Sequence, residues 1–223
     1  MATEEEKTAI RQALTDVRNP CIVELGAHCG EDEPWLRDAC QVVPKYVLVE
    51  PDPRNVQMII REGINYARRG ITCESRRVIV GAVAETNATR EFWMSDNART
   101  GDHGSGSLRR PTGHIEGMPW ITFDRKTMVE CYSLDFIFDS QWLHKIDLLW
   151  VDIQGAERDM IAGGQMALKY TRYLFMEAEE VELYEGEALK HELIAMLSGW
   201  TLLKDFGYNI FLRNENFSDR GPR

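Results

Sequence analysis

A chemically distinctive stretch follows the first apolar run of the chain, CIVEL at 21–25. Glu24 lies inside this run, and a short loop with glycine at both ends follows at 26–30. Glycine lets a ligand approach the backbone closely, and free N–H groups at such a turn commonly receive an anion. A carboxylate at Glu24 would instead repel pyrophosphate and attract an ammonium or sulfonium group. This combination favours S-adenosylmethionine (SAM) as the ligand.

A dinucleotide is an alternative ligand for the same loop. Dinucleotide-binding folds usually carry GxGxxG, whereas this loop reads GAHCG and lacks the middle glycine. Glu50 ends the next apolar run, where a carboxylate can accept hydrogen bonds from ribose hydroxyls, but dinucleotide enzymes use an acid at the same place. Three functions therefore stay open: a SAM-dependent methyltransferase, a nucleotide-dependent oxidoreductase, or a non-catalytic cofactor-binding module.

Three acids at the ends of later strands could carry out the chemistry of a methyl transfer. Such a transfer is an in-line displacement, so the protein must align the nucleophile and remove the proton of a weakly acidic hydroxyl. Asp152 follows IDLLWV at 146–151, Glu157 opens the next helix, and Glu177 ends YLFME. We expect Asp152 to face the methyl group as base or orienting group, with Glu157 and Glu177 as second choices. Alternatively, Glu157 could have no catalytic role and only stabilise the helix, because an acid in the first turn interacts favourably with the helix dipole.

A divalent metal could take the place of the base. Oxygen ligands suit Mg²⁺, which needs few carboxylates because it keeps several waters. Asp152 and Glu177 are the two residues that could hold it. Neither residue belongs to a ligand pattern as specific as a zinc motif.

A polar, glycine-rich insert at about 95–120 could contact the acceptor. Long loops in compact domains are commonly lids or binding loops. Here the insert carries His103, Ser107, Arg109 and Arg110, and the two arginines could hold a phosphate or carboxylate on the acceptor. A solvated loop without a binding role is the alternative interpretation.

The order of apolar runs predicts an α/β fold. Thr3 and Glu6 form a capping-box pattern that opens a helix expected over 3–18. Short β-branched runs then alternate with helical stretches, which is typical of a doubly wound, Rossmann-like parallel sheet. The last two runs are separated only by Gly207 and must pair antiparallel. Seven core strands are expected, at 21–25, 46–50, 77–83, 146–151, 173–177, 200–206 and 208–213. Neither a linker nor a repeat interrupts 1–223, so we expect a single domain.

Composition limits the partners. The chain has 36 acidic and 26 basic residues, a net charge of -10, which disfavours nucleic acid as a partner. Its five cysteines form no CxxC pair and fit free thiols in a reducing compartment. The N-terminal residues do not have the pattern of a signal peptide, and no apolar run is long enough to span a membrane. We expect a cytoplasmic protein that acts on a small hydroxylated acceptor.

Several segments together resemble one family. VELGAHCG, VLVEPDP, VIVGAVAE, SGSLRRP, YSLDFI, IDLLWVDIQGAERDMIAGG and YLFMEAE occur in the order typical of the FkbM-like family of class I, SAM-dependent methyltransferases. The resemblance covers roughly Cys21 to the C-terminus, and WVDIQGAE is its most specific segment. It implies a strand order of 3-2-1-4-5-7-6 with the last strand antiparallel. It also implies O-methylation of sugars, polyketides or related metabolites.

The resemblance also assigns cofactor contacts. Glu24, Gly26 and Gly30 would surround the methionine end, with Ala27, His28, Pro51 and Asp152 as further contacts. Glu50 would hold the ribose, and Gly81, Ala82 and Val83 the adenine. The chain departs from the family at His28, where asparagine is common, and at Gln154, where many members have glutamate. The second departure puts a carboxylate role at position 154 in doubt.

Overall fold

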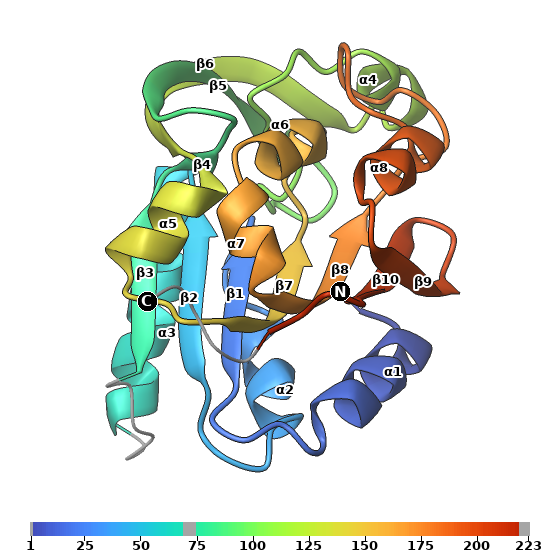
Figure 1. Ribbon diagram of the computed structural model, residues 1–223. Helices are drawn as coiled ribbons and strands as arrows, with labels where there is room; N and C mark the ends of the chain where they lie inside the picture. Colours follow the sequence, from blue (N-terminus) through green and yellow to red (C-terminus); the bar gives the residue numbers. More distant parts are fainter. Residues whose placement is uncertain (1, 69–74, 219–223) are drawn as a thin grey trace.

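The fold is built on a seven-stranded sheet. The computed structural model describes residues 2–68 and 75–218, and Figure 1 shows the sheet at the centre of the molecule. Its strand order is β3-β2-β1-β7-β8-β10-β9, which is the expected 3-2-1-4-5-7-6 order when the core strands are counted along the chain. β10 runs antiparallel to both neighbours, as expected, and the other neighbouring pairs in this sheet are parallel. The strands are β1 (Cys21–Leu25), β2 (Lys45–Glu50), β3 (Arg76–Val80), β7 (Ile146–Val151), β8 (Thr171–Glu177), β9 (Trp200–Asp205) and β10 (Asn209–Asn214).

Helices cover both faces because neighbouring residues of a strand point to opposite sides. Ile22 of β1 packs with the helices α1 to α3, whereas Val23 packs with α5 to α8. Both positions are fully buried, which explains the unbroken apolar runs of these strands. The helices are α1 (Glu4–Leu14), α2 (Glu33–Asp38), α3 (Pro53–Arg68), α4 (Gly113–Gly117), α5 (Leu134–Ser140), α6 (Glu157–Ala162), α7 (Gln165–Lys169) and α8 (Lys190–Met196).

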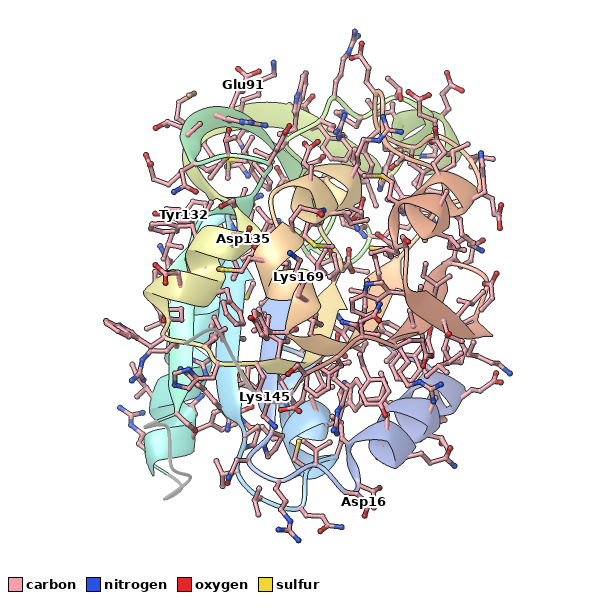
Figure 2. All side chains as sticks on the ribbon, viewed as in Figure 1. Asp16, Glu91, Tyr132, Asp135, Lys145 and Lys169 are labelled. Carbon is pink, nitrogen blue, oxygen red and sulfur yellow. The ribbon has the colours of Figure 1, made fainter. Side chains whose placement is uncertain are left out.

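Side-chain contacts fix the ends of two helices. The capping box predicted for α1 is present between Thr3 and Glu6, but the helix ends at Leu14 and not at residue 18. Asp135, labelled in Figure 2 at the start of α5, accepts hydrogen bonds from the backbone N–H groups of Met166 and Ala167 in the first turn of α7. A carboxylate at a helix N-terminus satisfies donors that the helix itself cannot.

A second sheet, which the sequence analysis did not predict, lies across the carboxyl ends of the main sheet (Figure 1). It has the order β4-β6-β5, with β4 at Ala82–Val83, β5 at Ala88–Asn97 and β6 at Ile121–Tyr132. The strand expected at 77–83 is therefore wrong as one element, because it divides at Gly81 into β3 and β4. A Cβ at Gly81 would lie 2.6 Å from the carbonyl oxygen of Glu130, so β4 can approach β6 closely only with glycine there. The insert expected at 95–120 joins β5 to β6, and its first residues belong to β5.

Two features of the described residues bear on expectations from composition. Within residues 2–68 and 75–218, no helix is both long and apolar enough to cross a membrane. Cys21, Cys29, Cys40 and Cys131 carry free thiols. Cys73, the remaining cysteine, lies outside the described residues.

Candidate functional site

Three neighbouring cavities lie at the carboxyl ends of the central strands, where open α/β sheets usually bind ligands. We call them cavity A, about 340 Å³, cavity B, about 140 Å³, and cavity C, about 170 Å³. Cavities A and B share Gly26, His28, Glu31 and Asp152. Gln154 lines both A and C, and Glu177 lines both B and C. The three cavities therefore meet around Asp152, Gln154 and Glu177.

Cavity A gathers most of the residues expected to bind the cofactor. The loops after β1 and β2 contribute Gly26, His28, Glu50 and Pro51. The β3–β4 junction and the end of β7 contribute Gly81, Ala82, Val83 and Asp152. The insert between β5 and β6 closes the cavity with residues that include His103.

Backbone contacts hold the loop after β1 against the end of β7. Gly26 has a φ of 77°, and a Cβ there would overlap the carbonyl oxygen of Asp152. His28 also has a positive φ, 46°, which is uncommon for a residue with a side chain. Its N–H donates to Glu50 Oε2 at 2.9 Å. Gly30 has a φ of 79° and donates to Ala27 at 2.7 Å, so it closes the turn and lines none of the three cavities.

Glu50 is almost fully buried at the end of β2, with 4% of its surface exposed. Besides His28, the backbone N–H of Asp52 donates to it at 2.8 Å and the side-chain amide of Asn55 at 3.2 Å. Burial raises the pKa of Glu50 to about 7 in spite of these hydrogen bonds. A carboxylate has about four acceptor sites, so three protein donors leave room for a further donor from a ligand in cavity A.

Glu24 lies at cavity B and already has a protein partner. The hydroxyl of Tyr46 donates to its carboxyl at 2.7 Å, and only 2% of Glu24 is exposed. Burial raises the pKa of Glu24 well above its usual range, which favours the protonated form. Ala27, Asp32 and Glu177 line the same cavity.

Gln154 connects the acids at the junction. Its side-chain amide donates to Asp152 at 2.5 Å and to Glu177 at 2.8 Å, while its amide oxygen accepts from the Tyr184 hydroxyl at 2.6 Å. Burial, followed by the charge of Asp152, raises the pKa of Glu177 well above its usual range. Burial also raises the pKa of Glu157 to about 8. The amide nitrogen thus lies between Asp152 and Glu177, the two residues considered as Mg²⁺ ligands.

Cavity C contains polar residues of the insert and of the segment that pairs with the insert. His114 and Tyr184 line it, each with 2% of its surface exposed, and Glu157 and Glu177 lie at the same cavity. Burial lowers the pKa of His114, and its Nδ1 has no hydrogen-bond partner. Tyr184 reaches this place because an isolated bridge with Pro111 joins its segment to the insert. No local sequence pattern indicates such a long-range contact.

The residues expected to contact the acceptor occupy different environments. His103 lines cavity A, with its Nδ1 3.3 Å from Asp96. Ser107 is buried, and its hydroxyl donates to the backbone carbonyl of Gln154 at 2.6 Å. Arg109 donates to Asp159 at 3.0 Å and to backbone carbonyls near Gly186. Arg110 is exposed, and neither arginine lines cavity A, B or C.

Comparison with known proteins agrees with this fold and identifies a family. Residues 24–210 match the model of the methyltransferase FkbM domain. The chain is 33% identical over 199 residues to the 2-O-methyltransferase NoeI of Sinorhizobium fredii, covering 87% of this chain and 77% of that protein.

Solved structures show the same fold at low sequence identity. Methyltransferase FkbM from Methylobacillus flagellatus superposes with a TM-score of 0.57 at 14% identity, over 89% of this chain. The matched part is 45% of the Methylobacillus chain, so this chain spans less than half of that protein. Cofactor-bound Rv0187 from MTB has a TM-score of 0.51 at 12% identity, covering 98% of this chain and 83% of that chain. The family match extends over most of the sequence and includes the cavity-forming segments, and the chain therefore belongs to the FkbM methyltransferase family.

Proposed function

We propose that the protein transfers the methyl group of SAM to a hydroxyl oxygen of a small metabolite, and that cavities A and B together hold the cofactor. The observation that carries this proposal is the meeting of the three cavities around Asp152, Gln154 and Glu177. A ligand that extends from A into B passes Gly26 and Asp152, which line both cavities and whose backbones lie in close contact because Gly26 has no Cβ.

The adenosine would lie in cavity A. Glu50 would accept a ribose hydroxyl, and the backbone at Gly81, Ala82 and Val83 would border the adenine. The methionine end would reach cavity B, where Ala27 and His28 form part of the wall. Because burial raises the pKa of Glu24 and its carboxyl accepts from Tyr46, it offers the methionine end less negative charge than an exposed carboxylate would. Asp152 then supplies a carboxyl group next to both cavities.

The acceptor would approach from cavity C. In support, Gln154 lines both C and A, and Glu177 lines both C and B. A hydroxyl bound in C would therefore lie beside the methyl group of the cofactor. NoeI is named a 2-O-methyltransferase, and a polyhydroxylated acceptor such as a sugar, or a polyketide or related metabolite, suits the hydrogen-bonding side chains of C.

Asp152 is the proposed proton acceptor or orienting group. Burial raises the pKa of Glu157 to about 8 and that of Glu177 well above its usual range, so each is less available as a proton acceptor near neutral pH than an exposed carboxylate. Mg²⁺ remains a lesser proposal, because the amide nitrogen of Gln154 would have to leave Asp152 and Glu177 before the ion could bind both. Retention of methyl transfer after exhaustive chelation would dismiss the metal.

The cofactor assignment is tested by thermal denaturation with S-adenosylhomocysteine or NAD. A ligand at about a hundredfold its Kd stabilises the folded state by about 2.7 kcal/mol. We expect a shift with the homocysteine compound alone, lost in Glu50→Ala and kept in Glu116→Ala, a matched change at an exposed position outside the three cavities. A shift with NAD alone would instead support the oxidoreductase alternative. Binding without methyl transfer to any cellular metabolite would support the non-catalytic module.

The role of Asp152 is tested by Asp152→Asn, with Asp159→Asn as the control because Asp159 pairs with Arg109 away from the cavities. Both variants should bind S-adenosylhomocysteine within a few fold of the unchanged protein. Transfer of labelled methyl from SAM to metabolites of the producing cells should be lost only in Asp152→Asn. Equal transfer by the two variants would refute the assignment.

The setting of the enzyme is also a proposal. We propose one methyltransferase domain over 1–223, acting in the cytoplasm, with no nucleic-acid or membrane partner. The free thiols of the described cysteines support a reducing compartment. The negative net charge of -10 supports the absence of a nucleic-acid partner.

A further inference from the structure

Three potential metal ligands lie side by side in the loop after β1. His28 Nδ1 is 3.7 Å from one carboxyl oxygen of Glu31, and Cys29 Sγ is 3.8 Å from the other. One ligand atom from each of the three residues lies within 4.8 Å of the others. The proposed methyltransferase chemistry uses neither the thiol of Cys29 nor the carboxyl of Glu31.

These separations are close to those of a tetrahedral zinc site. Zinc binds thiolate sulfur at about 2.3 Å and imidazole nitrogen or carboxylate oxygen at about 2.0–2.2 Å. In tetrahedral geometry, sulfur and oxygen ligands are then about 3.6 Å apart, and nitrogen and oxygen ligands about 3.4 Å. A contraction of a few tenths of an ångström would bring the two contacts of Glu31 to these distances, and the chosen ligand atoms of the three residues already lie within 4.8 Å of one another. Thiolate and imidazole ligands favour Zn²⁺ over Mg²⁺ or Ca²⁺.

We propose that His28, Cys29 and Glu31 form a Zn²⁺ site with a fourth position open to water. The backbone of the loop already holds the required arrangement. His28 keeps its positive φ of 46° through the hydrogen bond from its N–H to Glu50, and Gly30 closes the turn between Cys29 and Glu31. The exposed edge of the loop gives the ion access, since Cys29 is partly exposed and Glu31 lies near the surface.

The site has a consequence for the cofactor, and this step rests on the proposed function. His28 and Glu31 line both cavity A and cavity B. A cation between them lies where the cofactor passes from one cavity to the other and pulls both side chains toward itself. Zinc and the cofactor therefore compete, and Zn²⁺ inhibits the enzyme from the cofactor side.

Zinc binding is measured first, by calorimetric titration of the full chain with ZnCl₂ at pH 8. A mildly alkaline pH is used because Zn²⁺ binds the thiolate and the neutral imidazole, so its binding releases their protons. We expect one Zn²⁺ per chain, with at least tenfold weaker binding in Cys29→Ser. Cys40→Ser is the matched control, because Cys40 is another partly exposed thiol and its Sγ donates to the Leu36 carbonyl, outside the His28–Glu31 loop.

A second variant, Glu31→Gln, removes a different ligand, so weaker zinc binding by both variants cannot come from a local structural effect of serine at position 29. Thermal melting curves show whether each variant is folded. Equal zinc affinity in the unchanged protein, Cys29→Ser and Glu31→Gln would overturn the site. No zinc binding by the unchanged protein would overturn it as well.

Competition is measured with S-adenosylhomocysteine in the presence and absence of saturating Zn²⁺. Zinc should weaken its binding at least tenfold in the unchanged protein and in Cys40→Ser. At a Zn²⁺ concentration that fills the site of the unchanged protein but not the weakened site of Cys29→Ser, this variant should bind the compound equally with and without zinc. The substitution itself should not disturb cofactor binding, because Cys29 lines none of the three cavities. Unchanged affinity in all three proteins would refute the competition. If the compound does not bind even without zinc, the proposed function fails, whereas the zinc titration still decides the metal site.

Discussion

Buried carboxyl groups at the site should make the protein less stable as pH rises from mildly acidic to neutral. Burial raises the pKa of Glu50 from 4.5 to about 7 and that of Glu157 from 4.5 to about 8. Burial also raises the pKa values of Glu24 and Glu177. Between pH 5 and 6.5, Glu50 and Glu157 keep most of their protons in the folded state and lose them on unfolding. Stability then falls as pH rises, because the folded state binds more protons than the unfolded state.

The magnitude follows from the number of protons released. One full proton per molecule corresponds to about 1.36 kcal/mol of unfolding free energy per pH unit. Glu50 and Glu157 both differ almost fully between the two states from pH 5.5 to 6.5. They alone give an upper limit of about 2.7 kcal/mol per pH unit in this window. The contribution of Glu50 ends near pH 7 and that of Glu157 near pH 8.

Urea denaturation followed by tryptophan fluorescence at pH 5.5, 6.5, 7.5 and 8.5 measures this slope by linear extrapolation. The unchanged protein should lose about 1–3 kcal/mol between pH 5.5 and 6.5. Glu157→Gln should have a shallower slope, by up to about 1.4 kcal/mol per pH unit. Glu116→Gln, an exposed control, should follow the unchanged protein. Stability that stays constant or increases over this interval would refute the protonation states assigned to the buried acids.

Two further substitutions test single contacts. Tyr46→Phe removes the hydroxyl that donates to the buried carboxyl of Glu24. The variant should lose about 1–3 kcal/mol of unfolding free energy, measured by urea denaturation. A loss below about 0.5 kcal/mol would mean that a water molecule replaces the hydroxyl as donor. Gln154→Glu replaces the amide donor beside Asp152 with a third carboxylate and should lower the melting temperature. Added Mn²⁺ should restore it in the variant but not in the unchanged protein, whereas a metal response in both proteins would show that the unmodified cluster already binds divalent ions.

The sequence predicted the main sheet well because its strands are buried on both faces. A run such as IDLLWV predicts a buried strand from its local composition alone, since every residue of β7 is buried. In the second sheet only one face packs on apolar residues, and β6 alternates between buried positions at Ile121 and Phe123 and again at Val129 and Cys131. Charged residues at Asp124 to Lys126 interrupt this alternation, so the segment does not read as one long strand. The backbone N–H and C=O groups of β6 form hydrogen bonds with β5. No local sequence pattern predicts this pairing.

The residues of the candidate site also differ in how well the local sequence predicts them. Residues that act through the local backbone, such as Gly26 and Glu50, could be identified because a glycine turn and an acid after adjacent parallel strands lie at one edge of a sheet. Gln154 was noticed only as a departure from the family pattern. Its contacts with Glu177 and Tyr184 join segments that are separated in sequence, and they depend on the insert reaching over the sheet. An ionised glutamate at 154 could not donate to Asp152 or Glu177, so the neutral amide supplies a hydrogen-bond donor that brings these two acids together.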